Sequence, residues 1–180
     1  MERLKLATMW LGGCSGCHMS FLDLDEFLIE LAGMAEIVYS PIVDAKVFPE
    51  HVDATLVEGA VANEDHLGLV RNARARSDFL VAFGDCAITG NVTAIRNPLG
   101  GARVVLDRSY LCRADLRPAV PESPGVLPRL LDRVVPVHAV VPVDAFLPGC
   151  PPPAGRIRET LSQLATRHAA RLAGADLKFG

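Results

Sequence analysis

The chain has 180 residues, which suits a single domain, and because half of them are hydrophobic and 22% are charged it can bury a core. The formal net charge of −3 gives no electrostatic reason to expect a nucleic acid or an anionic membrane surface as partner. No stretch reaches the roughly 20 apolar residues of a membrane-spanning helix, and the N-terminal sequence shows neither a twin-arginine pair nor a small-residue cleavage site. We therefore expect a cytoplasmic protein that binds neither nucleic acid nor membrane.

The first half of the chain alternates between strand-like and helix-like segments. Apolar runs of strand length occupy residues 5–11, 36–39, 54–61 and 79–83. Ser20, which precedes Asp23 by three residues, is expected to cap the first helix, and Asn63 is expected to cap the second. Trp10, near the end of the first strand, is expected to pack in the core, the alternative being contact with the following loop or with a partner subunit. This alternation predicts an α/β fold in which helices cover both faces of a parallel sheet.

The pattern weakens between residues 97 and 143. Prolines recur in this stretch, which predicts a loop-rich excursion within the domain, with short strands at 104–106 and near 137–141. A helix is expected over residues 153–172 because a proline stands in its first turn and apolar residues recur at helical spacing. We expect one domain over residues 1–180.

Four of the five cysteines stand at meaningful places in this scheme. Cys14 and Cys17 follow the first strand, Cys86 follows the strand at 79–83, and Cys150 precedes the last helix. Loops after parallel strands gather at the carboxyl edge of the sheet, so these loops can bring four thiolates together. A 4Fe–4S cluster is held by four such thiolates.

The Cys-x-x-Cys spacing of Cys14 and Cys17 has other interpretations. It is compatible with half of a structural zinc site, with a thioredoxin-like redox pair or with coincidence. A zinc site typically has a second close pair, whereas Cys86 and Cys150 are far apart in sequence, and a redox pair needs neither of them. Cys112 lies in the proline-rich excursion, and we interpret it as a free or structural thiol.

Four sequence blocks together resemble the small subunits of NiFe hydrogenases, and they occur in the order typical of that family. They are Gly-Cys-Ser-Gly-Cys-His-Met-Ser-Phe-Leu-Asp (13–23), Val-Glu-Gly-Ala-Val (57–61), Phe-Gly-Asp-Cys-Ala-Ile-Thr-Gly-Asn (83–91) and Leu-Pro-Gly-Cys-Pro-Pro-Pro (147–153). The resemblance implies a flavodoxin-like, three-layer α/β domain with one 4Fe–4S cluster in loops at the carboxyl edge. The ligands that it implies are Cys14, Cys17, Cys86 and Cys150, and it implies no catalytic residue in this chain.

The resemblance also implies partners. A large subunit would hold the nickel–iron centre that splits hydrogen, and this chain would relay the electrons. The chain resembles the NAD-reducing, bidirectional cytoplasmic hydrogenases in two features, the sequence Cys-Ser-Gly-Cys-His-Met-Ser and its short length. In those, a diaphorase module with FMN and further iron–sulfur clusters reduces NAD. Two alternatives stay open, a single-cluster relay subunit of a membrane-associated hydrogenase-like or Complex I-like assembly, and a zinc-stabilised interaction domain.

Further residues beside the cysteines are expected to surround the site or face the partner. They are Gly13, Gly16, His18, Glu58, Gly59, Asp85, Thr89 and Gly149. Glu58 interrupts an apolar strand, and a buried carboxylate needs a partner. His18 follows a predicted ligand, and it is expected to donate to a cluster sulfur, to face the partner subunit or to contact solvent. Asp85 and Thr89 are expected to hold the loop of Cys86.

Overall fold

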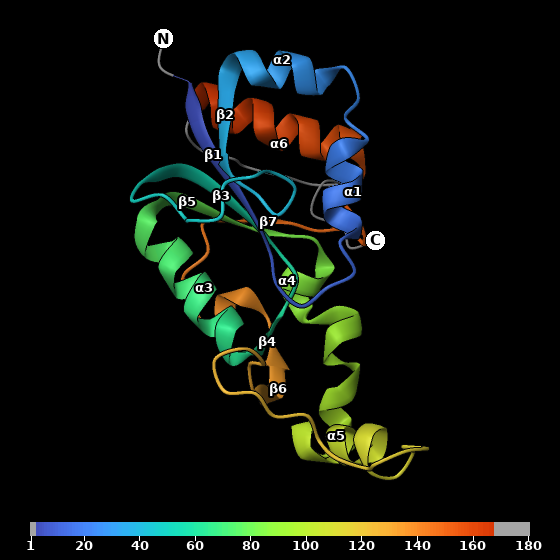
Figure 1. Ribbon diagram of the computed structural model, residues 1–180. Coiled ribbons are helices and arrows are strands. Elements are labelled where there is room, and N and C mark those ends of the chain that lie inside the picture. The colour runs from blue at the N-terminus through green and yellow to red at the C-terminus, as the bar shows by residue number, and fades with distance from the viewer. Residues whose placement is uncertain (1–2, 168–180) are drawn as a thin grey trace.

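Five parallel strands form the central sheet of the computed structural model, which describes residues 3–167 of the chain (Figure 1). They are β1 (Leu4–Trp10), β2 (Ala35–Tyr39), β3 (Val52–Glu58), β5 (Ser77–Phe83) and β7 (Ala145–Leu147). Their order in the sheet is β2-β1-β3-β5-β7, with every neighbouring pair parallel. This is the flavodoxin-like order 2-1-3-4-5, so the predicted fold class is confirmed.

Helices cover both faces of this sheet, which makes three layers. On one face lie α1 (Gly16–Leu22), α2 (Phe27–Met34) and α6 (Ala154–Arg167), while α3 (Glu64–Arg76) and α4 (Asp85–Thr89) lie on the other (Figure 1). Each face has its own hydrophobic core. The central strands β1, β3 and β5 are buried by both layers, which explains why they read as nearly continuous apolar runs.

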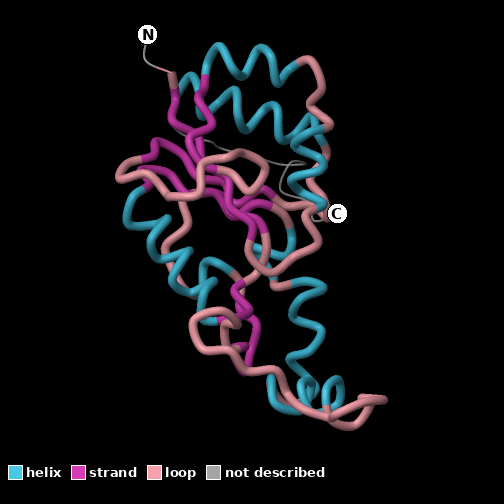
Figure 2. Tube along the Cα trace, in the orientation of Figure 1, coloured by secondary structure: helices cyan, strands magenta, loops and turns pink. Residues whose placement is uncertain are grey.

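A smaller lobe extends from the sheet edge that carries the loops after the strands (Figures 1 and 2). It contains the antiparallel pair β4 (Val61–Asn63) and β6 (Leu130–Val135), the 3₁₀ helices η1 (Asn91–Leu99) and η2 (Val137–Ala139), and α5 (Ala102–Tyr110). The strands expected at 104–106 and near 137–141 are therefore wrong. The first lies within α5 and the second begins in η2, because a short apolar run does not distinguish strand from helix.

The strands expected in the first half are confirmed, although β3 ends at Glu58 rather than at residue 61. The chain turns at Gly59, whose φ is +89° and which lies so close to Gly12 that an added Cβ would meet its backbone at 2.9 Å. Gly12 and Ala60 then form an isolated bridge. Glycine is needed at position 59 both for this conformation and for the close approach.

The predicted start of the first helix is wrong. Ser20 lies inside α1, and its hydroxyl group donates to the backbone carbonyl of Pro152 at 2.6 Å instead of capping a helix. The cap at Asn63 is confirmed, because its side chain accepts the backbone N–H of His66 at 2.8 Å. The last helix begins at Ala154, and the part expected beyond residue 167 lies outside the described residues. Within residues 3–167, every helix is too short or too polar to cross a bilayer.

Candidate functional site

The four predicted ligands meet at the carboxyl edge of the sheet, contributed by three loops. Cys14 and Cys17 follow β1, Cys86 lies in α4 directly after β5, and Cys150 follows β7. The other three thiols lie close enough to Cys17 for each of them to raise the pKa of its thiol. Cys17 and Cys86 are buried, whereas Cys14 and Cys150 are exposed in the isolated chain. The site therefore opens onto the surface of this subunit.

Backbone hydrogen bonds join the loop of Cys86 to the loop of Cys150. The N–H of Gly84 donates to the carbonyl of Leu147 at 2.8 Å, and the N–H of Asp85 donates to the carbonyl of Gly149 at 2.9 Å. The Asp85 carboxylate in turn accepts the N–H of Gly149 at 2.7 Å. The hydroxyl of Thr89 donates to the Asp85 carbonyl at 2.8 Å. Asp85 and Thr89 thus position the two loops, in line with their expected role.

Gly84, which the sequence analysis did not select, is essential to the packing around the thiols. Its φ is +83°, and a Cβ built on it would lie 2.2 Å from the sulfur of Cys17. Such a distance is shorter than any van der Waals contact, so only glycine fits here. Gly16 is less constrained, since its Cβ would lie 3.3 Å from the sulfur of Cys14. The glycine directly after β5 was the signal that could have identified Gly84.

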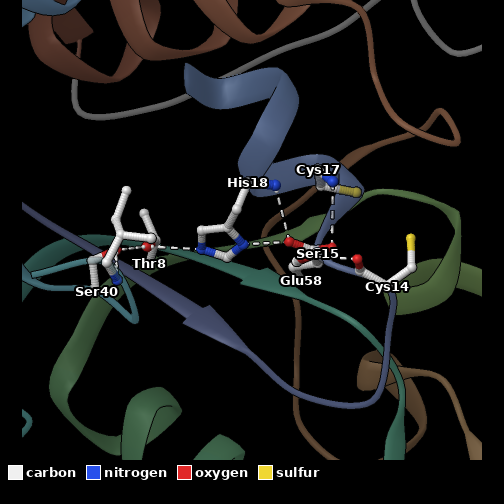
Figure 3. A network of polar contacts seen from close by, with 8 residues as sticks. Thr8, Cys14, Ser15, Cys17, His18, Ser40 and Glu58 are labelled. Carbon is white, nitrogen blue, oxygen red and sulfur yellow. Dashed lines mark hydrogen bonds and ion pairs between the residues drawn. The ribbon is translucent and has the colours of Figure 1, made fainter. Parts of the chain in front are cut away.

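Glu58 lies beneath the loop of Cys17 and is almost fully buried (Figure 3). Its carboxylate accepts the backbone N–H groups of Cys17 at 3.3 Å and of His18 at 3.0 Å, and it also contacts Nδ1 of the His18 ring. The other ring nitrogen lies 3.0 Å from the Thr8 hydroxyl, which donates to Ser40 at 2.7 Å. Glu58 therefore has the partners that a buried carboxylate needs.

The structure contradicts two of the three expectations for His18, contact with solvent and donation to a cysteine sulfur. Its side chain is buried between Glu58 and Thr8, so it neither contacts solvent nor donates to a cysteine sulfur. Trp10 also differs from its expected core position, because 46% of its surface is exposed at the end of β1. Gly13 lies beside both Glu58 and Trp10, because a Cβ built on it would be 3.8 Å from Oε1 of Glu58 and 3.8 Å from Nε1 of Trp10.

Two nitrogen donors near the thiols were missed by the sequence analysis. The side-chain amide of Asn91 donates to the sulfur of Cys150 at 3.3 Å. The backbone N–H of Val92 lies near Cys86 and lowers the pKa of its thiol. Both come from the first turn of η1, which follows directly after α4. Nothing in the spacing of the sequence distinguishes Asn91 from an ordinary turn residue.

The electrostatics of the site disfavour four free thiolates. Burial, then Glu58, then the other three cysteines raise the pKa of Cys17 far above its ordinary value. Burial also raises the pKa of Cys86, as do Cys14 and Cys150, and the N–H of Val92 opposes this only in part. A bound cationic metal core would offset this repulsion, and four thiolates are soft ligands for an iron–sulfur cluster or for zinc. The donor set therefore fits a 4Fe–4S cluster.

Cys112 is separate from this site. It is exposed in the turn that follows α5. It is not among the groups that change the pKa of Cys17 or Cys86. The interpretation of Cys112 as a thiol outside the ligand set is consistent with this position.

Comparison with known proteins defines the class to which this fold and cysteine site belong. The model of the family described as NADH ubiquinone oxidoreductase, 20 Kd subunit, matches residues 14–164, and the chain belongs to this family. The match includes all four cysteines of the site.

Individual relatives are hydrogenase subunits. The chain is 37% identical to the NAD-reducing hydrogenase HoxS subunit delta of Cupriavidus necator, over 90% of this chain and 78% of that one. It is 32% identical to the sulfhydrogenase 2 subunit delta of Pyrococcus furiosus, over 82% of this chain and 56% of that one, so it spans little more than half the length of this second relative. A crystal structure of an NAD⁺-reducing NiFe hydrogenase in the H₂-reduced state superimposes with a TM-score of 0.92 at 36% identity, covering 99% of this chain and 100% of that chain. The resemblance to NiFe hydrogenase small subunits is thereby confirmed.

Proposed function

We propose that this chain is the electron-transfer small subunit of a cytoplasmic, NAD-reducing NiFe hydrogenase. It holds one 4Fe–4S cluster on Cys14, Cys17, Cys86 and Cys150 within a single iron–sulfur domain. Electrons reach it from the nickel–iron centre of a large subunit and leave toward a diaphorase module with FMN and further clusters. Hydrogen reacts at the large subunit, and no catalytic role is assigned to the described residues 3–167 of this chain.

The observation that carries this proposal is the meeting of four thiols at one edge of a flavodoxin-like sheet. Three loops that are distant in sequence supply them, and Cys17 interacts with all of the others. The match to an NAD⁺-reducing hydrogenase along nearly the whole chain supports the assignment of this arrangement to that class. A zinc site would use the same ligands, but it would not supply an electron carrier.

When bound, the cluster supplies a one-electron redox centre. The chain's own residues set its place and surroundings. Burial of Cys17 and Cys86 excludes water from one side of the site, and Asp85 fixes the spacing between the loops of Cys86 and Cys150. Glu58 fixes the turn that carries Cys17 through its two backbone contacts. These contacts would hold in place the loops that surround the cluster.

The open side of the site provides a surface suited to the large subunit. Exposed apolar side chains occur within a few residues of the cysteines in sequence, with Trp10 46%, Met19 57% and Val92 51% exposed. Cys14 and Cys150 are exposed at the same edge. A partner that covers this edge would bury the apolar side chains and shield the cluster. Electron transfer from a nickel–iron centre requires the large subunit to approach on such a side.

The experiment is to produce the chain together with its large and diaphorase subunits and to measure NAD reduction by hydrogen. We expect hydrogen-dependent NADH formation and loss of this activity in Cys86→Ser, whereas Cys112→Ser retains it. Complexes that assemble and oxidise hydrogen with an artificial dye, but give no reduction of NAD, would contradict the assignment of the electron acceptor.

A second candidate is a single-cluster relay subunit of a Complex I-like or membrane-associated hydrogenase-like assembly. It is favoured by the description of the matching family, which names a subunit of NADH ubiquinone oxidoreductase. This alternative predicts that the chain purifies with membrane subunits and that hydrogen does not reduce NAD. The same preparation therefore distinguishes the two candidates.

A further inference from the structure

The first turn of η1 carries a nitrogen donor that faces a sulfur of the site. Asn91 donates from its side-chain amide to the sulfur of Cys150 at 3.3 Å. Asp85 joins the loop of Cys150 to the segment of Cys86, and that segment leads directly into η1. The donor therefore comes from one loop and the sulfur from the other.

The backbone of this segment is built around Asn91. Its φ is +34°, and it follows Gly90, whose φ is +86°. Asparagine is among the few residues other than glycine that adopt the left-handed region readily. The N–H of Asn91 is held by the Thr89 hydroxyl at 3.2 Å, and the Thr89 hydroxyl is itself anchored on the Asp85 carbonyl. The position of the Asn91 amide is therefore fixed by the loop that carries Cys86.

We propose that Asn91 is a positioning residue whose side-chain amide, through its contact with Cys150, raises the reduction potential of the cluster. This inference rests on the proposed function and extends it. Reduction adds negative charge, part of which resides on the cysteine sulfurs, and an N–H group aimed at a sulfur stabilises that charge. The reduced state gains more than the oxidised state, so the electron is accepted at a higher potential.

Glu58 lies beside a different ligand of the site. Its carboxylate is almost fully buried, accepts the backbone N–H of Cys17 at 3.3 Å and also contacts the His18 ring. A buried acid disfavours negative charge added nearby. The amide of Asn91 therefore offsets part of the effect of Glu58, which gives Asn91 a role beyond loop structure.

The test is an EPR-monitored redox titration of the full chain carrying its cluster, in complex with the large subunit. Asn91→Gly removes the donor and keeps a residue that tolerates the positive φ. We expect the ratio of reduced to oxidised cluster at a fixed applied potential to fall about threefold, which is about 28 mV for a one-electron couple. Asn91→Asp, which replaces the donor by a carboxylate, should shift the midpoint further in the same direction.

Asn97→Asp is the matched control. Asn97 lies in the same 3₁₀ helix and anchors it to Val134 through two hydrogen bonds of 2.8 Å, without contact to a cysteine. An equal shift in this variant would show that charge or loosening of η1, and not the contact with Cys150, sets the potential, and it would overturn the inference.

Resonance Raman spectra of the same samples provide a second readout, because loss of an N–H···S contact alters the iron–thiolate stretching bands. Unchanged bands and an unchanged midpoint in Asn91→Gly, with iron and sulfide retained, would overturn the inference and leave the proposed function intact. A chain that carries no iron and sulfide at all would overturn both.

Discussion

His18 and Glu58 lie 40 residues apart in sequence and form a buried hydrogen-bonded pair directly behind Cys17. Glu58 receives both the backbone N–H and the ring of His18, and a third donor comes from the N–H of Cys17. The loop after β1 is thereby attached to the end of β3. The position of Cys17 consequently depends on a carboxylate that does not itself touch the metal site.

Replacing Glu58 by alanine should lower the free energy of unfolding by about 3 kcal/mol, because it leaves buried donors of Cys17 and His18 without an acceptor. Urea unfolding of the full chain under anaerobic, reducing conditions measures this change. Glu36→Ala is the control, since the ion pair of Glu36 with Arg3 is exposed, and its loss should cost less than about 1 kcal/mol. Equal costs for the two variants would contradict the importance of the buried pair.

Gly84→Ala should empty the site. The added Cβ would lie 2.2 Å from the Cys17 sulfur, and the φ of +83° would be strained for alanine by about 1–3 kcal/mol. We expect most of the bound iron and sulfide to be lost while far-UV circular dichroism stays close to that of the parent protein.

Gly68→Ala is the opposite case. Gly68 lies within α3, and nothing stands within 4 Å of an added Cβ. This variant should keep its iron and gain about 0.5–1 kcal/mol of stability, because alanine favours the helix. If the two alanine variants retain the same amount of iron, the predicted contact with Cys17 does not govern the site.

His66 makes the folded state sensitive to acid. Burial lowers the pKa of His66 below its ordinary value, and the Ala60 carbonyl and Asp65 oppose this only in part. Its ring Nδ1 lies 3.2 Å from the N–H of Ala62, which suits a neutral ring that accepts this bond. Below about pH 6.5 the unfolded chain binds a proton that the folded chain does not, so His66 lowers stability as the pH falls.

The free energy of unfolding measured between about pH 7 and pH 5 should therefore decrease less in His66→Gln than in the parent protein. Glutamine can accept and donate hydrogen bonds but does not titrate in this range. A steeper loss of stability in His66→Gln than in the parent would show that His66 is stabilised in its charged form.

Most of the sheet could be predicted from the sequence because β1, β3 and β5 are buried on both faces and form unmistakable apolar runs. The cysteines could be assigned to one site because parallel strands deliver their following loops to the same edge. The identity of the metal group is predicted by the family resemblance, because spacing alone leaves it open. For the sheet and for the grouping of the cysteines, local pattern and topology were sufficient.

The remaining features depend on contacts between distant segments. Ser20 has the spacing of a helix cap, yet its hydroxyl donates to the carbonyl of Pro152, which is 132 residues away in sequence. His18 is polar and follows a cysteine, but its side chain is buried because it pairs with Glu58 at the end of β3. Asn91 contacts Cys150 only after two loops have come together. None of these partners can be inferred from sequence spacing.

The proposed function requires that Cys14, Cys17, Cys86 and Cys150 hold one 4Fe–4S cluster. The most direct measurement is the iron and acid-labile sulfide content of the anaerobically purified full chain, together with its EPR spectrum after reduction. We expect about four iron and four sulfide per chain, with strong loss in Cys86→Ser or Cys150→Ser and none in Cys112→Ser. One zinc per chain, with no sulfide and no EPR signal, would contradict the account and identify a structural metal site instead.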